Sequence, residues 1–180
     1  MTDGSFTLRQ FTCPGDVPLR LRQALTACWV EVTNAGGAAG FPFPPVDAAE
    51  VAPALDRIVG LLSPDTGRLL TATADGDLVG WLSLRRDPGR LIAHWGTVHH
   101  VQTRPDVRGR GIGRALMDEA RRAARDEMGL EQLHLAVRGG LGLEDFYDRL
   151  GWREIGRRPG ALRLAPGDDR DEILMLLSPL

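Results

Sequence analysis

Hydrophobic residues along the chain recur with two different spacings, and these spacings distinguish expected helices from expected strands. In four segments an apolar side chain appears every three or four residues, which is the repeat of one helix face. Local signals mark the helix ends: Asp47 can cap the second helix, and Gly129 and Gly151 can end the third and fourth. The expected helices cover residues 17–32, 48–62, 112–128 and 143–150.

Seven other segments are typical of strands, because they are apolar throughout or alternate apolar and polar residues. They cover residues 5–12, 69–73, 78–84, 91–103, 133–137, 152–158 and 172–177. Asp75-Gly76 favours a tight hairpin turn between the second and third. The order β-α-α-β-β-β-α-β-α-β-β predicts an α/β fold with a mixed sheet and helices on both faces. No repeat or linker divides it, so we expect a single domain over residues 1–180.

Composition narrows the classes of partner. The 180 residues include 22 basic and 24 acidic side chains, and the net charge of −2 provides no attractive field for nucleic acid or an anionic membrane. No apolar run approaches ~18 residues, and the N-terminus lacks the pattern of a signal peptide. We therefore expect a cytoplasmic protein that acts on a small molecule. Composition does not decide whether it forms a homodimer. Cys13 and Cys28 are expected to be reduced, since a disulfide-dependent fold of this size would carry more cysteines.

The stretch from Val101 to Leu116 predicts a strand end, a glycine-dense loop and a helix start, an arrangement that can bind a pyrophosphate. Gly109, Gly111 and Gly113 let the backbone approach a ligand closely, and the first N–H groups of the helix point at it unpaired. The arginines that flank the loop are Arg104, Arg108, Arg110 and Arg114. A dinucleotide fingerprint would need a glycine where Arg114 stands, and a P-loop would need a lysine, which the chain lacks.

The pattern Arg108-x-x-Gly111-x-Gly113, between a strand and a helix, resembles the [QR]-x-x-G-x-[GA] signature of the GNAT superfamily of acyl-CoA-dependent N-acyltransferases. The segment from Phe146 to Trp152 resembles that superfamily's F-Y-x-x-L-G-[FW] segment, and the order of elements resembles the GNAT order over essentially the whole chain. Four segments also resemble the branch that contains the tabtoxin-resistance acetyltransferase: residues 36–41, 117–119, 159–160 and 166–168. His99 and His100, just before the signature, depart from that branch.

The resemblance implies a GNAT fold, a mixed and mostly antiparallel sheet of about seven strands whose fourth and fifth strands splay apart. It implies acetyl-CoA as the acyl donor, with the fourth strand's backbone binding the pantetheine arm and the loop binding the pyrophosphate. The implied cofactor-binding residues are Val101, Gln102, Thr103, Arg108, Gly109, Arg110, Gly111, Ile112, Gly113 and Arg114. Arg104 and Arg110 could instead be solvated surface charges. The four histidines show no metal-ligand spacing with Cys, Asp or Glu, which predicts no metal site.

Two residues are candidates for the proton transfers that acylation of an amine requires. The resemblance places Tyr147, the only tyrosine, near the CoA sulfur, where it can protonate the departing thiolate. The alternative is a core tyrosine with its hydroxyl in water. His99 resembles in placement a histidine of the arylalkylamine acetyltransferase branch, and its near-neutral pKa suits a general base. Strand alternation puts His99 on the face of Val101 and His100 on the other face, but isolated strand histidines are most often structural or solvated.

Three functions stay open. The first is transfer of an acetyl group from acetyl-CoA to a primary amine of a small molecule, by direct attack in a ternary complex. The others are a protein or peptide N-acetyltransferase and a non-catalytic acyl-CoA-binding module. Tyr147 and His99 favour an enzyme. The loop of residues 34–45, rich in Gly and Pro, favours a closed pocket, with Phe41 and Phe43 forming either a lid or a plug at the core edge.

Overall fold

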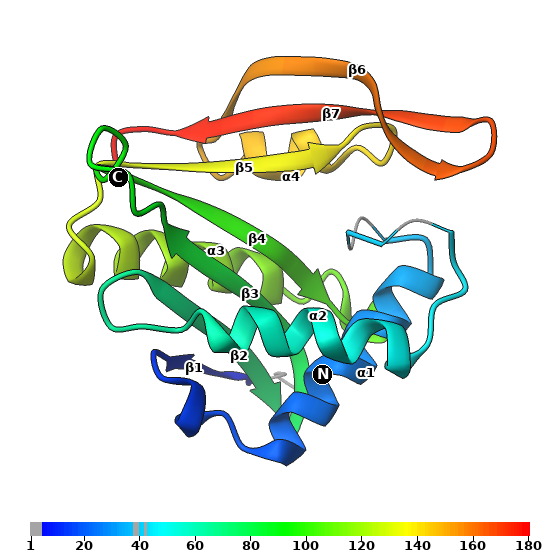
Figure 1. Cartoon of the computed structure of the whole chain (residues 1–180), viewed down its shortest axis with the longest axis horizontal. Helices are drawn as coiled ribbons and strands as arrows, with labels where there is room; N and C mark the ends of the chain where they lie inside the picture. The colour runs from blue at the N-terminus through cyan, green and yellow to red at the C-terminus, as the bar shows by residue number, and fades with distance from the viewer. Residues whose placement is uncertain (1–4, 38–39, 42) are drawn as a thin grey trace.

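The computed structural model describes residues 5–37, 40–41 and 43–180, and its strands and helices follow the expected order (Figure 1). The strands are β1 (Thr7–Phe11), β2 (Gly67–Ala74), β3 (Asp77–Arg86), β4 (Trp95–Thr103), β5 (Gln132–Arg138), β6 (Arg153–Ala165) and β7 (Asp168–Leu177). The helices are α1 (Leu19–Asn34), α2 (Ala48–Gly60), α3 (Ile112–Arg122) and α4 (Leu143–Asp148). A π-helical turn, Ala123–Glu127, continues α3. The expected α/β fold with a mixed sheet is confirmed.

Three strand boundaries differ from the expectation by four residues or more: the start of β4, the end of β6 and the start of β7. Residues 91–94 form a turn rather than the start of β4: the Ile92 N–H donates to the carbonyl of Gly89, and Leu91 is 93 % exposed. Strands β6 and β7 are longer than expected because they form a hairpin whose outer part is mostly solvated. A solvated ribbon needs no apolar alternation, so the hydrophobic pattern did not mark its full length.

The sheet has the strand order β1-β2-β3-β4-β5-β7-β6, and only the pair β4–β5 is parallel. These two strands pair only from Trp95–Thr97 to Gln132–His134. Beyond that point they diverge, and Figure 1 shows β4 and β5 opening away from each other. The sheet is therefore split into a β1–β4 part and a β5–β7 part that meet at a short parallel contact.

Local sequence signals account for the turns and caps that hold these elements. Asp75 and Gly76 have φ of 52° and 86°, the two left-handed residues that a tight hairpin between β2 and β3 requires. The Asp47 carboxylate accepts from the N–H groups of Ala49 and Glu50, and the Glu50 carboxylate accepts from the N–H of Asp47. This capping box starts α2 after the preceding loop.

Helices cover both faces of the β1–β4 part, so β2 and β3 are buried on both sides. On one face Leu70, Leu82 and Leu84 belong to the core cluster that includes α3 and α4. On the other face Leu69 and Trp81 pack in the cluster that includes α1 and α2. Figure 1 shows α1 and α2 in front of the sheet and α3 behind it. Two separate cores therefore cover the two faces of β2 and β3, and Val98 of β4 belongs to the core beside α3.

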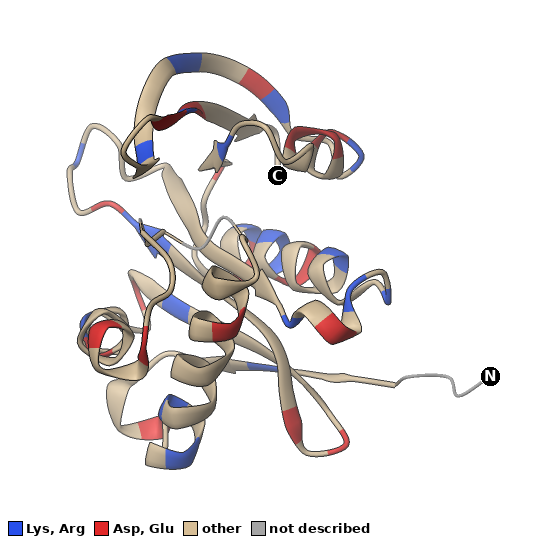
Figure 2. Ribbon diagram, turned by 90° about the vertical axis from the view of Figure 1, so that its right-hand side faces the viewer, with Lys and Arg blue, Asp and Glu red and all other residues tan. Residues whose placement is uncertain are grey.

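Acidic and basic residues are interspersed over the helices and the β6–β7 hairpin (Figure 2), as the net charge of −2 leads one to expect. In the part of the chain that the structure describes, no helix is long and apolar enough to cross a membrane. The two cysteines are free, with Cys28 buried in the core beside α1 and Cys13 half-buried.

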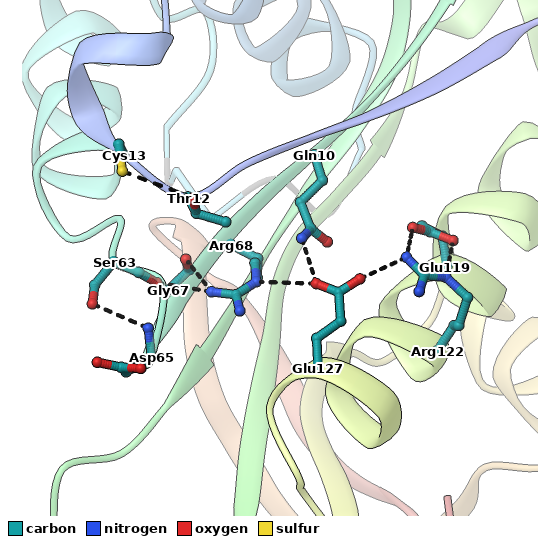
Figure 3. Close-up of polar contacts among 10 residues, drawn as sticks. All are labelled: Gln10, Thr12, Cys13, Ser63, Asp65, Gly67, Arg68, Glu119, Arg122 and Glu127. Atoms are coloured by element: carbon teal, nitrogen blue, oxygen red, sulfur yellow. Dashed lines mark hydrogen bonds and ion pairs between the residues drawn. The ribbon is translucent and has the colours of Figure 1, made fainter.

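A network of charged side chains ties the end of α3 to the first two strands (Figure 3). Arg68 of β2 is 4 % exposed, donates to two backbone carbonyl oxygens at 2.8 and 3.2 Å, and lies 3.8 Å from the Glu127 carboxylate. Glu127, in the π-helical turn, also accepts from Gln10 of β1 at 2.7 Å and from Arg122 at 2.8 Å. These bonds, the one from Gln10 foremost, hold the pKa of Glu127 below its usual value.

We expect Glu127→Gln to lower the free energy of unfolding by about 1–3 kcal/mol, because the buried Arg68 guanidinium loses its counter-charge. Urea denaturation measures this. Asp126→Asn is the matched control, since Asp126 lies in the same turn but pairs only with the exposed Arg125, and it should cause no measurable change. Equal losses in the two variants would show that the network adds no stability beyond that of a surface ion pair.

Candidate active site

A cleft of about 960 Å³ opens where β4 and β5 diverge. Residues Thr97–Thr103 of β4 and Leu135–Arg138 of β5 line it, together with the end of α1, the start of α3, α4 and part of β6. Past Thr97, the facing edges of the two strands have no strand partner within the described residues. Their backbone N–H and C=O groups can be satisfied by an extended, amide-containing ligand that lies between them like an added strand.

The glycine loop at one end of the cleft has the geometry of an anion site. Gly109 and Gly111 both have φ of +80°, which L side chains adopt only with strain. A Cβ at either residue would meet no atom within 4 Å, so the space beside the backbone is open. Gly111 caps α3 without a side-chain bond, and the first intrahelical bond reaches Ala115 N–H, so the preceding N–H groups of α3 are free for an anion.

The four arginines around this loop have different environments. Arg104 is held by Glu31 of α1 at 3.4 Å and by Asp106 at 3.1 Å, which supports the interpretation that it is not a ligand of the anion site. Arg114 pairs with Asp118 at 3.6 Å. The guanidinium groups of Arg108 and Arg110 make no hydrogen bond or ion pair within the described chain, and of these two only Arg108 lines the cleft. The structure therefore brings Arg108 and Arg114 to the loop and leaves Arg110 on the outer surface.

The end of β4 brings Val101, Gln102 and Thr103 to the cleft. The Val101 side chain packs against the core cluster beside α3. Gln102 pairs across the sheet with Trp81 and is 1 % exposed, and both polar atoms of its amide lack a hydrogen-bond partner. Thr103 lies beside Gly113, where an added Cβ would be 3.6 Å from the threonine hydroxyl.

A β-bulge in β4 changes the face on which the two histidines lie. His100 and Val101 together lie opposite the single residue Leu82 of β3, and His100 has φ of 55°. The strict alternation expected from the sequence is therefore wrong at this point, because a bulge inserts one extra residue into the strand. His99 and His100 lie on the same face, and Val101 lies on the opposite one.

Both histidines line the cleft on the side of α1. The His100 ring lies between Trp29 and Trp81, with ring centroids 4.6 and 5.7 Å away, and is 6.0 Å from the ring of His99. Burial, and after it the Arg85 guanidinium, lowers the pKa of His99 below its usual value. Burial and the neighbouring His99 lower the pKa of His100 to about 4. At neutral pH both rings are uncharged, which is the state that can accept a proton.

Tyr147 is the buried residue of α4, whereas the expected apolar stripe of Leu143, Phe146 and Leu150 is only half-buried. Its ring packs edge-on against Phe146 at 5.0 Å and Trp152 at 6.1 Å. It lines the cleft, and its hydroxyl makes no hydrogen bond to other described residues. Burial raises the pKa of the phenol above its usual value, so it stays protonated. The group can therefore donate a proton into the cleft.

Two hydrogen bonds connect the loop between α1 and α2 to the far wall of the cleft. The Arg138 guanidinium, at the end of β5, donates to the carbonyl of Gly36 at 2.6 Å. The N–H of Phe43 donates to the carbonyl of Leu164 in β6 at 2.7 Å. One end of the cleft is therefore bridged from the α1 side to the β6 side.

The two phenylalanine side chains of that loop lie in different environments. Phe41 packs edge-on against Trp29 at 5.1 Å and lines the cleft, so it plugs the edge of the core. Phe43 is 53 % exposed and does not line the cleft. Ala38, Ala39 and Pro42 of the same loop of residues 34–45 lie outside the described residues.

Several cleft residues were not singled out from the sequence. Arg138, Glu172 and the β6 segment 161–164 all line the cleft. A signal existed for Arg138, because it ends the strand next to the expected splay. No local signal marks β6 or Glu172, since their approach to the cleft depends on the long hairpin.

Neither the cysteines nor the acidic groups form another reactive centre in the described ranges. Burial raises the pKa of the Cys28 thiol to about 12, and neither Cys28 nor Cys13 lines the cleft. Among residues 5–37, 40–41 and 43–180, no group of three or more His, Cys, Asp or Glu side chains could hold a metal ion.

Comparison with known proteins extends these observations. The model of the acetyltransferase (GNAT) family matches residues 21–152. The chain is similar to the structure of a candidate phosphinothricin N-acetyltransferase, with 20 % identity and a TM-score of 0.77 over 97 % of this chain and 98 % of that chain.

Two further structures are similar over most of their length. One is the ribosomal-protein-alanine N-acetyltransferase from Brucella melitensis, with 21 % identity and a TM-score of 0.71 over 96 % of this chain and 99 % of that chain. The other is a candidate acetyltransferase from Salmonella typhimurium, solved with its cofactor acetyl-CoA, with 18 % identity and a TM-score of 0.70 over 96 % of this chain and 93 % of that chain. These likenesses establish the fold, and the fold expected from the sequence is confirmed.

Proposed function

Because the chain belongs to the acetyltransferase (GNAT) family, we propose that it transfers the acetyl group of acetyl-CoA to the primary amine of a small molecule. It is an acetyl-CoA-dependent N-acetyltransferase, and the proposal adds the class of acceptor and the roles of individual residues. We also propose that the whole described chain acts as one domain. The tabtoxin-resistance branch stays a prediction that rests on the segments quoted above.

The assignment of a small-molecule acceptor rests on the two hydrogen bonds that bridge one end of the cleft. The Gly36 and Phe43 backbone groups are bonded to β5 and β6, respectively. A protein acceptor modified at an internal side chain would need a groove open at both ends to admit a continuous chain, whereas a chain N-terminus would need one opening only. The cleft volume of about 960 Å³ lies within the range of small-ligand sites, and the pantetheine arm must occupy part of it.

In the proposed complex, the N–H groups at the start of α3, with Arg108 and Arg114, bind the pyrophosphate of acetyl-CoA. The unpaired edge of β4, residues 101–103, binds the pantetheine arm. Arg110 would add its positive charge to the pyrophosphate site from the outer surface of the loop. This arrangement directs the thioester towards the apex of the cleft, where β4 and β5 part.

Acyl transfer then requires two proton movements. The neutral amine attacks the thioester carbonyl, a C–N bond forms and the C–S bond breaks. His99, uncharged at neutral pH, takes the proton that the amine loses, directly or through water. Tyr147, kept protonated by burial, gives a proton to the departing thiolate. No covalent enzyme intermediate is needed, which agrees with the absence of both cysteines from the cleft lining.

We expect Gly111→Glu to abolish acetyl-CoA binding, measured by isothermal titration calorimetry, because the side chain fills the socket and repels the diphosphate. Gly111→Ala is the control. In both variants a non-glycine residue at φ of +80° costs about 1–2 kcal/mol of backbone strain. Alanine, however, adds neither a large side chain nor a charge. A folded Gly111→Glu protein with wild-type affinity would contradict the assignment of the loop.

We expect Tyr147→Phe to lower kcat by about 10²-fold, at the low end of the range for a positioned proton donor because a thiolate is already a fair leaving group. The ring is kept, so unfolding temperature and acetyl-CoA affinity should change little. Steady-state kinetics with the best amine, beside calorimetry of the cofactor, separate these effects. Full turnover in the variant would mean that Tyr147 serves packing only.

We expect kcat/KM to fall at low pH as His99 becomes protonated, with a midpoint below the ordinary histidine value of about 6.5, since burial and Arg85 lower its pKa. His99→Gln should lower turnover and remove this acidic limb. His100→Asn is the control, because asparagine tolerates a positive φ and should leave the limb in place. If the limb persists in His99→Gln with the same midpoint, the base lies elsewhere.

A further inference from the structure

Arg138 is the last residue of β5 and lines the cleft beyond the point where β4 and β5 stop pairing. Its guanidinium donates to the carbonyl of Gly36, just after α1. The His100 ring faces the same loop, 3.8 Å from where a Cβ on Gly40 would lie, and His99 adjoins it. Arg138 and the proposed base therefore both border the loop between α1 and α2, on the side of the cleft opposite the start of α3.

Three charged residues from the β5–β7 part of the sheet line the cleft: Arg138, Arg163 and Glu172. Among the described residues, only Arg138 of these three has no ion-pair partner. Arg163 also lines the cleft, but its Nε and Nη2 groups donate to the Asp169 carboxylate at 2.6 and 2.8 Å. Glu172 is the one carboxylate among the described lining residues and the cross-strand neighbour of Arg138, yet it accepts from Arg158 at 2.6 Å. Within the described chain, Arg138 forms no ion pair, and its bond goes to a neutral carbonyl.

The surroundings of Arg138 add to this imbalance. Burial, and after it the positive charge of Arg170, lowers the pKa of Arg138. Asp168, the acid that opposes this effect, is itself bonded to Arg170. An arginine side chain stays charged under all ordinary conditions, so a half-buried guanidinium beside a second one is stabilised by an added anion.

We infer that the acceptor carries a carboxylate as well as the amine, and that Arg138 binds this carboxylate. The inference rests on the proposed small-molecule function and narrows it to amino-acid-like acceptors. One N–H of the guanidinium is used by Gly36, and the others form the planar fork that matches a carboxylate. The amine is then held towards His99 and the thioester, with the carboxylate anchored at the bridged end of the cleft.

The experiment compares α-amino acids with their own carboxamides as acceptors, for the wild type and for Arg138→Gln. The quantity measured is the ratio of kcat/KM for acid over amide, which cancels differences in amine basicity when the same pair is used with both proteins. We expect the wild type to prefer the acid, and the ratio to fall by about 10- to 100-fold in the variant, the range for one charge-assisted pair. Arg138→Lys keeps the charge without the fork and should give an intermediate ratio.

Arg163→Gln is the matched control, since Arg163 lines the same cleft but is already paired, and its ratio should equal that of the wild type. A second measurement does not depend on turnover. A carboxylic acid with the same side chain but no amine should bind the wild type with acetyl-CoA present, and its affinity should fall by the same factor in Arg138→Gln, as measured by calorimetry.

The outcomes separate this inference from the proposed function. Suppose that small amines are acetylated, but that kcat/KM for the acid and for the amide falls by the same factor in Arg138→Gln. Arg138 then only holds the loop in place, so the inference is wrong while the proposed function is unaffected. A wild type that prefers amides at a pH where both amines are largely neutral would also overturn it. If neither acid nor amide is acetylated but peptide N-termini are, the proposed function itself fails and the inference with it.

Discussion

The short parallel contact between β4 and β5 is the constraint on which the rest of the structure depends. The two strands share only Trp95–Thr97 and Gln132–His134, and beyond these residues each strand pairs only with its other neighbour, β3 or β7. Strand β4 is held by its antiparallel pairing with β3 and by the core beside α3, and β5 by its antiparallel pairing with β7. Since neither strand can turn to rejoin the other, a strip of backbone polar groups is left unpaired inside the protein. Such groups are costly unless a ligand or water satisfies them, which is the physical basis for proposing that acetyl-CoA binds where the strands diverge.

Burial sets different protonation states along this cleft. At the glycine loop, free N–H groups and the exposed Arg108 favour a polyanion. At the centre, burial lowers the pKa of His99 and raises that of Tyr147, so one group is an available acceptor of protons and the other an available donor at neutral pH. Their roles in catalysis stay predictions. At the bridged end the unpaired Arg138 favours a second anion. Desolvation therefore accounts for the neutral centre of the cleft, and arginine side chains supply a positive charge on either side of it.

The bulge at His100 links the core to the chemistry of the cleft. Its positive φ is uncommon for a residue other than glycine, and the ring is held in place between Trp29 and Trp81. The extra residue turns His99 and His100 to the same face and turns Val101 to the opposite core. Without the bulge, strand alternation would place the two rings on opposite faces of the sheet. A packing arrangement that involves α1 therefore decides which imidazole groups line the cleft on the side of that helix.

Features made by neighbouring residues were readable from the sequence, and features made by distant ones were not. The Asp75-Gly76 turn, the Asp47–Glu50 capping box and the glycine loop before α3 each depend on a few adjacent residues, so residue type and spacing predicted them and, with them, the order of elements and the family. The bulge at His100 depends on rings from α1 and β3, and the burial of Tyr147 depends on Trp152. The free charge of Arg138 depends on where Glu172 and Asp168 find their partners. Apart from Tyr147–Trp152 and Asp168–Arg170, which are close in sequence, those contacts join residues far apart in the chain. They form only when the sheet and its two cores assemble, because pairing and burial are properties of the packed whole and not of a local pattern.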